Sequence, residues 1–343
     1  MKKGVLFGVV CAALLFISTF AACSSNDEPV ADNLEDTIMS SGGFDGFMVS
    51  VDSLNNIYSL KSRANTVVSH DGVDVSPINA RLNRDKLVSF ADQVGTYSGM
   101  VSAVTLTIVA SGASGGTLST IAGVFGIVAP TWYSHYYSAI TKLATITWGY
   151  SVSSPKLNSI SSIRCASDDM SHSFVDSIGA RHNRLMVNLS KYDKKYNTLD
   201  LLDRNVQNQF YSDFVKEMKN LYPEFQGVEL SASSRDEMIS KAIDILKIAK
   251  KNIDKTDYYN CFVKDSYDLI TKKYKISEEN ARLLKDYSTS LSLQCEKLDY
   301  DDLERYADDL NKVINSSNLD KSQKQAIVSV SQISINSSLC WKE

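Results

Sequence analysis

The residues most suggestive of chemistry are Gly112-Ala113-Ser114-Gly115-Gly116, which match the G-x-S-x-G pattern of a serine nucleophile. In α/β-hydrolases this pattern lies on a tight turn between a strand and a helix, so that the serine hydroxyl is exposed. Here the β-branched run VTLTIVA precedes it and a helix-like segment follows. The reaction would also need a parallel sheet, an acid and a histidine, yet no succession of further strands follows. A serine hydrolase acting through Ser114 is therefore a distant alternative.

His182 and Asn183 are candidates for buried polar residues. His182 shares a helical stripe with four apolar residues, namely Phe174, Ile178, Leu185 and Leu189. A histidine on such a face usually bonds to a neighbouring carbonyl or carboxylate in the core. A catalytic base would need a partner nucleophile, and the surrounding sequence offers none. The pattern predicts a structural role for both residues.

Acidic residues gather at Asp299, Asp301, Asp302 and Glu304, which raises the question of a calcium site. An EF-hand loop needs a glycine at its sixth position and a bidentate acid at its twelfth, and neither spacing is met. Acids at the start of a helix, where the dipole favours them, explain the run. The cysteine spacings do not resemble a zinc site. We expect no metal and no cofactor.

Four cysteines follow Cys23 in the chain: Cys165, Cys261, Cys295 and Cys340. In an exported protein an even number of cysteines indicates disulfides. If residues 257–274 and 277–297 form an antiparallel helical hairpin, Cys261 and Cys295 lie within about one turn of being opposite. That pairing leaves Cys165 for Cys340. Free cysteines buried in a helical core are the alternative.

Five small residues step four, three, four and three positions apart, namely Gly112, Gly116, Ser119, Gly123 and Gly126. On a helix they share one face and let a neighbouring backbone approach closely. The stretch from Gln93 to Thr141 contains no Asp, Glu, Lys or Arg. A central helix or hairpin buried in a bundle fits these features.

Two other interpretations of this apolar stretch remain. A transmembrane span needs about 20 mostly apolar residues, and that length is available. A latent membrane-active hairpin, stored in the bundle and released on a target membrane, would also use small-residue packing. The aromatic cluster PTWYSHYY at 130–137 suits a membrane interface, although it equally suits the packed face of a helix.

The N-terminus has the charged, apolar and small-residue order of an export signal, with Ala21 and Ala22 directly before Cys23. This order resembles a bacterial lipoprotein box, which implies removal of residues 1–22 and lipidation of Cys23. Residues 23–45 begin with polar and acidic side chains and are expected to form a flexible tether. Serine and acidic residues just after the cysteine resemble the surface-export signal of Bacteroidota lipoproteins.

A second resemblance lies further along the chain. Gly179, His182 and Asn183 form a G-x-x-H-N element followed by Leu185, and residues 313–341 look like a pair of terminal helices. Both features resemble a set of uncharacterised Bacteroidota surface lipoproteins. That resemblance implies an outer-membrane lipoprotein, exposed at the cell surface or facing the periplasm, and it implies no particular activity.

Composition and periodicity predict the fold class. The chain has 343 residues, 43% of them hydrophobic, which suffices for one large or two modest cores. From about residue 79 onward apolar residues recur three and four positions apart, as in amphipathic helices. Ser234-Arg235-Asp236-Glu237 and Asp320-Lys321-Ser322-Gln323 resemble capping boxes that start helices. We predict a mainly α protein in which residues 79–343 form a multi-helix bundle around the apolar, small-residue segment 100–130.

Residues 46–78 contain turn formers and partial alternation, and predict a small irregular region or a short hairpin.

These features together favour one function over two others. The formal net charge of −4, with no basic run, argues against nucleic-acid partners. We expect a lipid-anchored, cell-surface helical protein that contacts the membrane through Cys23 and binds an unknown protein or glycan without catalysis. The alternative is a membrane-active effector, pore-forming or bacteriocin-like, that uses segment 100–130.

Overall fold

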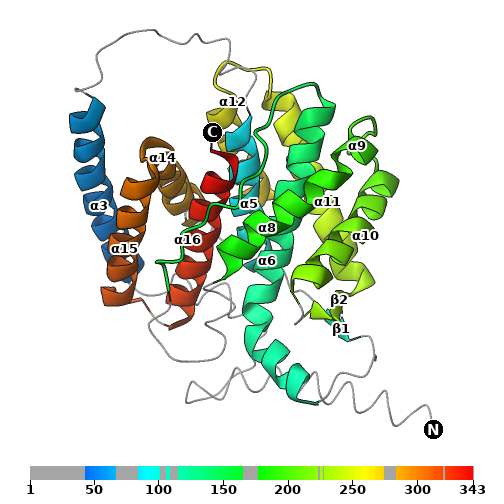
Figure 1. Ribbon diagram of the computed structural model, residues 1–343, viewed down its shortest axis with the longest axis horizontal. Coiled ribbons are helices and arrows are strands. Elements are labelled where there is room, and N and C mark those ends of the chain that lie inside the picture. The colour runs from blue at the N-terminus through cyan, green and yellow to red at the C-terminus, as the bar shows by residue number, and fades with distance from the viewer. Residues whose placement is uncertain are drawn as a thin grey trace.

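The computed structural model describes residues 43–66, 84–100, 106–108, 115–164, 177–222, 225–226, 228–273, 283–319 and 321–342. They form a mainly α, multi-helix bundle with very little strand (Figure 1). The fold class predicted from the apolar periodicity is confirmed.

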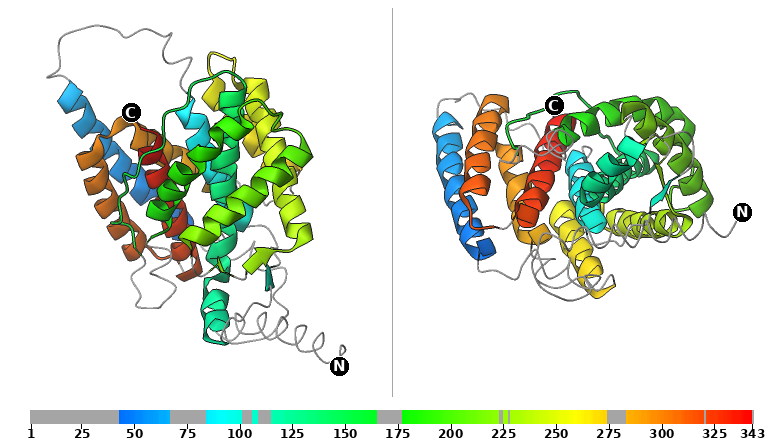
Figure 2. Two further views of the ribbon diagram at one scale, coloured as in Figure 1. Left: turned by 45° about the vertical axis from the view of Figure 1, so that its right-hand side comes forward. Right: turned by 90° about the horizontal axis from the view of Figure 1, so that it is seen from below.

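Two helices, α5 (Asp85–Met100) and α6 (Gly115–Thr147), pack side by side at the centre of the bundle (Figure 2). They run antiparallel, because the N–H of Arg84 bonds to the carbonyl of Ser151 at one end while Gly95 lies against Ser134 further along. The strand β1 (Leu106–Ile108) lies between them in sequence and pairs antiparallel with β2 (Val228–Leu230).

Other helices surround this pair. The helices α8 (Ile178–Leu189), α10 (Arg204–Leu221) and α11 (Ala232–Asn252) pack around α6 and one another. The short η1 (Ser190–Tyr192) and α9 (Asp193–Tyr196) connect α8 to α10. On α10, Phe210, Phe214 and Met218 are buried, as their spacing predicts.

The remaining helices complete the other side of the bundle. The last described helix, α16 (Lys321–Trp341), packs against both α5 and α8, and α12 (Tyr258–Lys272) packs against α11 and α5. A π-helical turn, η3 (Leu283–Ser288), leads into α14 (Thr289–Lys297), which packs on α16. At the edge, α15 (Tyr300–Ser316) lies beside α3 (Gly43–Thr66) (Figure 2).

The helix α3 corrects the predicted N-terminal organisation. Residues 43–66 are helical, so the irregular region or hairpin expected from residue 46 is wrong over this range, and residues 43–45 belong to a helix and not to the expected tether. Five buried residues follow the three-and-four spacing of a helix and pack toward the core: Phe44, Phe47, Val51, Leu54 and Tyr58. The β-branched and turn-forming residues between them produced the apparent alternation. Residues 67–78 and 1–42 lie outside the described residues.

Helix starts show how local sequence fixes element boundaries. The Asp299 carboxylate accepts a hydrogen bond from the N–H of Asp302, so the acidic run caps and begins α15. The N-cap of α11 is Ser231, whose hydroxyl accepts from the N–H of Ser234, so the expected start at Ser234 is three residues too late. The helix α16 begins at Lys321, directly after Asp320.

The helix α6 has two parts. Its second half, from Thr131 to Thr145, is buried throughout and includes the whole aromatic run Trp132, Tyr133, Tyr136 and Tyr137. The backbone of its first turns extends past the ends of the neighbouring helices in both Figure 1 and the left view of Figure 2. Among the described helices, none combines the length and the hydropathy that a bilayer crossing requires.

An extended segment follows α6 and runs across α16 (Figure 1). We call residues 152–164 the strap. It has no helical or strand structure of its own, and the N–H of Lys156 bonds to the carbonyl of Cys340 at 2.8 Å.

Candidate functional site

Five polar side chains from four helices meet in the centre of the bundle: Asp92, Ser134, His135, His182 and Ser337. We call them the polar cluster. Asp92 comes from α5, Ser134 and His135 from α6, His182 from α8 and Ser337 from α16. Every member is fully buried. It combines two histidines with a buried carboxylate, which are groups suited to acid–base chemistry.

Asp92 is the centre of the polar cluster. Its Oδ1 lies 2.9 Å from Nε2 of His182, an ion pair when the histidine is protonated. The hydroxyl of Ser134 donates to the same oxygen at 3.3 Å, and the hydroxyl of Ser337 donates to Oδ2. A buried carboxylate is costly unless it is paired and hydrogen-bonded. These three contacts supply that compensation.

The two histidines have different partners. Nδ1 of His182 lies 2.9 Å from Oδ1 of Asn183. Nε2 of His135 lies 2.7 Å from the hydroxyl of Tyr222, just beyond α10. The two rings meet edge to face, with centroids 4.8 Å apart and planes at 72°.

Their pKa values shift in opposite directions. Burial, reinforced by the neighbouring His182, lowers the pKa of His135 well below its ordinary value of 6.5. Burial also acts to lower the pKa of His182, but the charge of Asp92 and hydrogen bonds to Asp92 and Asn183 outweigh it and raise the pKa above 6.5. The two shifts therefore favour protonation of His182 over protonation of His135.

The polar cluster is not arranged for nucleophilic catalysis. Both ring nitrogens of His182 are already engaged, one with Asp92 and the other with Asn183. The hydroxyls of Ser134 and Ser337 donate to Asp92, whereas a serine nucleophile would donate to the histidine. What the arrangement does is hold α5, α6, α8 and α16 together through one buried carboxylate.

The other predicted site residues are placed only in part. Gly112 and Ser114 lie outside the described residues, and Gly116, Ser119, Gly123 and Gly126 lie on the first turns of α6, where only the backbone is described. The strand preceding Ser114 exists. Within the described part of the chain, β1 pairs only with β2 and runs antiparallel to it, whereas a hydrolase elbow lies in a parallel sheet.

A close helix approach occurs at a position that the small-residue pattern did not include. A Cβ atom built on Gly95 of α5 would lie 2.6 Å from the Cα of Ser134 and 2.7 Å from the carbonyl oxygen of Tyr133. Gly95 is thus the glycine that lets α5 and α6 touch. Gly95 lies in the same charge-free stretch as the predicted small residues, but on α5, whereas four of those residues lie on α6.

The predicted disulfides are wrong. Cys261, Cys295 and Cys340 are free thiols, and Cys165 lies outside the described residues. The hairpin geometry fails because the π-helical turn η3 precedes α14, and α14 packs on α16. Cys295 therefore points into the core, where burial raises its pKa to about 12, while Cys261 is half-exposed on α12.

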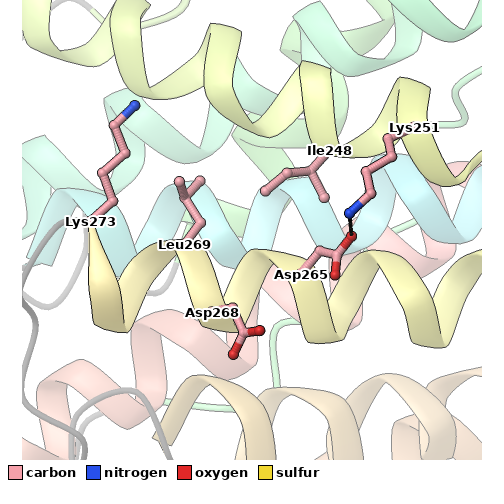
Figure 3. Close-up of a pocket in the computed structure, with 6 residues that line it drawn as sticks. All are labelled: Ile248, Lys251, Asp265, Asp268, Leu269 and Lys273. Carbon is pink, nitrogen blue, oxygen red and sulfur yellow. Dashed lines mark hydrogen bonds and ion pairs between the residues drawn. The ribbon is translucent and has the colours of Figure 1, made fainter.

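The surface carries a hollow, open to solvent, between α11 and α12 (Figure 3). Ile248 and Leu269 line it together with four charged residues, namely Lys251, Asp265, Asp268 and Lys273. Lys251 pairs with Asp265 at 2.9 Å, and Lys273 pairs with Asp244 at 2.5 Å. Asp268 pairs with Lys272 at 3.4 Å, so each of the four charged lining residues already has an ion-pair partner. Among the described residues no group of three or more His, Cys, Asp or Glu is placed to hold a metal ion.

No family model, curated protein or solved structure matches this chain. The function must therefore be inferred from the residues and their geometry.

Sequence reasoning found His182 and Asn183, which are both fully buried, but missed their partners. Asp92, Ser134 and Ser337 lie on three other helices, and Ser337 is 245 positions from Asp92. The sequence offered one indication that Asp92 is unusual: it is the last acidic residue before the charge-free stretch.

Proposed function

We propose that this protein is a lipid-anchored helical binding protein, exposed at the surface of the outer membrane, that performs no chemistry of its own. The single observation that carries the binding role is the burial and mutual engagement of the polar cluster. The groups best suited to catalysis, His182 and His135, support the core. What the bundle offers to its surroundings is its surface, which fits a protein or a glycan partner.

The anchor rests on Cys23 after Ala21 and Ala22, and on the acidic residues that follow. The position of α3 supports it. This first described helix lies at the edge of the bundle, next to α15 (Figure 2). A tether entering there leaves the opposite side of the bundle free to face a partner.

The test is cell fractionation of the wild type and Cys23→Ala. The wild type should remain in the membrane fraction after a carbonate wash, and protease added to intact cells should degrade it. Cys23→Ala should be released, since it has no site for the lipid. A matched Cys261→Ala variant, which removes a half-exposed thiol elsewhere, should behave like the wild type. Cys23→Ala that stays membrane-bound would contradict the anchor.

A second candidate function, a membrane-active effector, is favoured by one observation. The first turns of α6, which carry the apolar residues of 115–130, extend past the neighbouring helices (Figures 1 and 2). The second half of α6 is held firmly in the aromatic core. An apolar helix end that extends past its neighbours suits contact with lipid.

A further inference from the structure

The strap is held by a set of side-chain amides on three helices: Asn183, Asn311, Asn315, Gln332 and Asn336. We call this set the amide row. Asn336 pairs with both backbone groups of Ile160, accepting from its N–H at 2.8 Å and donating to its carbonyl at 3.0 Å. A neighbouring β-strand would satisfy a residue in the same way.

Other members of the amide row also form hydrogen bonds with backbone groups of the strap. Asn311 accepts from the N–H of Arg164 at 2.9 Å, while Asn315, one turn later on α15, donates to the carbonyl of Arg164 at 3.4 Å. Gln332, one turn before Asn336 on α16, donates to the carbonyl of Ile163.

Asn183 of α8 donates to the carbonyl of Asn158 at 2.5 Å and also to the carbonyl of Asn336 at 2.9 Å. It therefore links the strap to α16. The amide row thus binds backbone atoms at Asn158, Ile160, Ile163 and Arg164, in an extended conformation.

Side chains also hold the strap. Before the amide row, the hydroxyl of Ser153 donates to Asp85 and Nζ of Lys156 donates to the carbonyl of Lys342, each at 2.6 Å. Ile160 and Ile163 are 4% and 1% exposed, whereas Leu157 is 61% exposed. The part of the strap that the amide row binds, residues 158–164, is therefore recognised by its extended backbone and by two aliphatic side chains three residues apart. Any polypeptide supplies the backbone groups, and many supply the aliphatic pair.

We propose that the amide row is a binding site for an extended segment of a partner protein, and that the strap occupies this site when no partner is bound. The proposal rests on the proposed binding function and names its ligand class, an extended polypeptide with aliphatic residues at positions i and i+3. A partner segment replaces the strap without altering the helices, because the contacts are made to backbone groups that both segments share.

The test uses the full-length chain with Cys23→Ala, so that its outcome is separate from that of the anchor. A strap-released variant carries Ile160→Asp and Ile163→Asp, since charges at these buried positions oppose docking. The probe is a fluorescent peptide with the sequence of residues 152–164, and its anisotropy reports binding. A peptide with both isoleucines changed to aspartate is the control probe. Leu157→Asp is the matched control variant, because this exposed side chain does not hold the strap in place.

The strap-released variant should bind the peptide at least about tenfold more tightly than the wild type, whose own tethered strap competes at high effective concentration. Leu157→Asp should behave like the wild type. Adding Asn336→Ala to the strap-released variant should weaken binding by about tenfold, because the paired hydrogen bonds to one residue are lost. A strap-released variant that is folded by circular dichroism and does not distinguish the two peptides would overturn the proposal.

Hydrogen exchange on the wild type keeps the proposal testable if the strap-released variant fails to fold. The amides of Ile160 and Arg164 should exchange through local opening, faster than the amide of Ile333 within α16. Exchange of all three at one common rate, set by global unfolding, would show that the strap is a permanent part of the core and would also overturn the proposal.

Discussion

His135 and His182 lie in ring contact, yet the protein favours opposite charge states for them. The difference comes from position relative to one carboxylate. His182 touches Asp92 directly, whereas His135 touches the hydroxyl of Tyr222 and feels the charge of His182. A polar core arranged in this way is most stable only while one histidine is charged and the other neutral.

The stability of the protein should therefore fall on both sides of a maximum. The pKa of His135 is lower in the folded than in the unfolded state, so its contribution is present above the unfolded value of 6.5 and is lost as pH falls below it. The pKa of His182 is raised, so its contribution is full below 6.5 and is lost as pH rises through its folded pKa. Each tenfold difference in proton affinity between the two states changes the unfolding free energy by about 1.4 kcal/mol.

Urea unfolding at a series of pH values checks this expectation. His135→Gln, which keeps a partner for Tyr222, should reduce the loss of unfolding free energy on the acid side of the maximum. His182→Gln should flatten the loss on the alkaline side, whatever its effect on absolute stability. Two variants with pH slopes identical to that of the wild type would show that the histidine pair does not control the profile.

At the scale of single residues, the sequence indicated which faces of the helices are buried, but it did not indicate which distant residues those faces contact. The apolar stripe around His182 predicts burial, because helical periodicity is a local property. No local pattern indicates that Asp92 will face His182 or that Asn336 will bind the strap, since those pairings depend on how distant helices pack. The side-chain amides that bind the strap look in sequence like ordinary polar residues of a helix surface.

At the scale of elements, the contact between α5 and α6 makes a sharp prediction. Gly95→Ala places a methyl group 2.6 Å from the backbone of Ser134, so the two helices must separate. Overpacking of this kind costs about 1 to 3 kcal/mol. Thermal and urea unfolding should both show the loss.

Gly46→Ala is the matched control, because Gly46 is also helical and a Cβ built there meets nothing within 4 Å. Alanine is the better helix former, so this variant should be neutral or more stable by up to about 1 kcal/mol. If Gly95→Ala proves as stable as Gly46→Ala, the helices do not pack as closely as described.

Elements were predicted well where periodicity was strong and poorly where the chain departs from regular geometry. The stripe on α10 has an uninterrupted spacing, and its central residues are buried as expected. The helix α3 was missed because its apolar residues are separated by glycine, serine and aspartate. The disulfide prediction assumed regular α-helical geometry, which the π-helical turn η3 does not have.

At the scale of the whole molecule, the two candidate functions differ in whether the N-terminal turns of α6 insert into a membrane. Full-length protein with Cys23→Ala, mixed with phosphatidylcholine and phosphatidylglycerol vesicles, should release no trapped dye if the protein only binds partners. The membrane-active alternative expects release, and Phe125→Asp should abolish it, because a charge is costly in the bilayer interior. Release by the wild type that is lost in Phe125→Asp while the melting temperature is unchanged would favour that alternative.

The polar cluster also constrains when the molecule can acquire its structure. Asp92 gains the hydrogen bond to its second carboxylate oxygen only after Ser337 has been synthesised, and Ile160 meets Asn336 across 176 positions of chain. A nascent chain that still lacks α16 therefore lacks one of the three contacts to this carboxylate, and its strap has no complete docking surface. We expect the core of such a chain to close slowly, because loop closure over this length must precede the contacts that reward it. Late closure of this kind would suit the export that the sequence before Cys23 predicts, because an exported chain crosses the membrane before it folds.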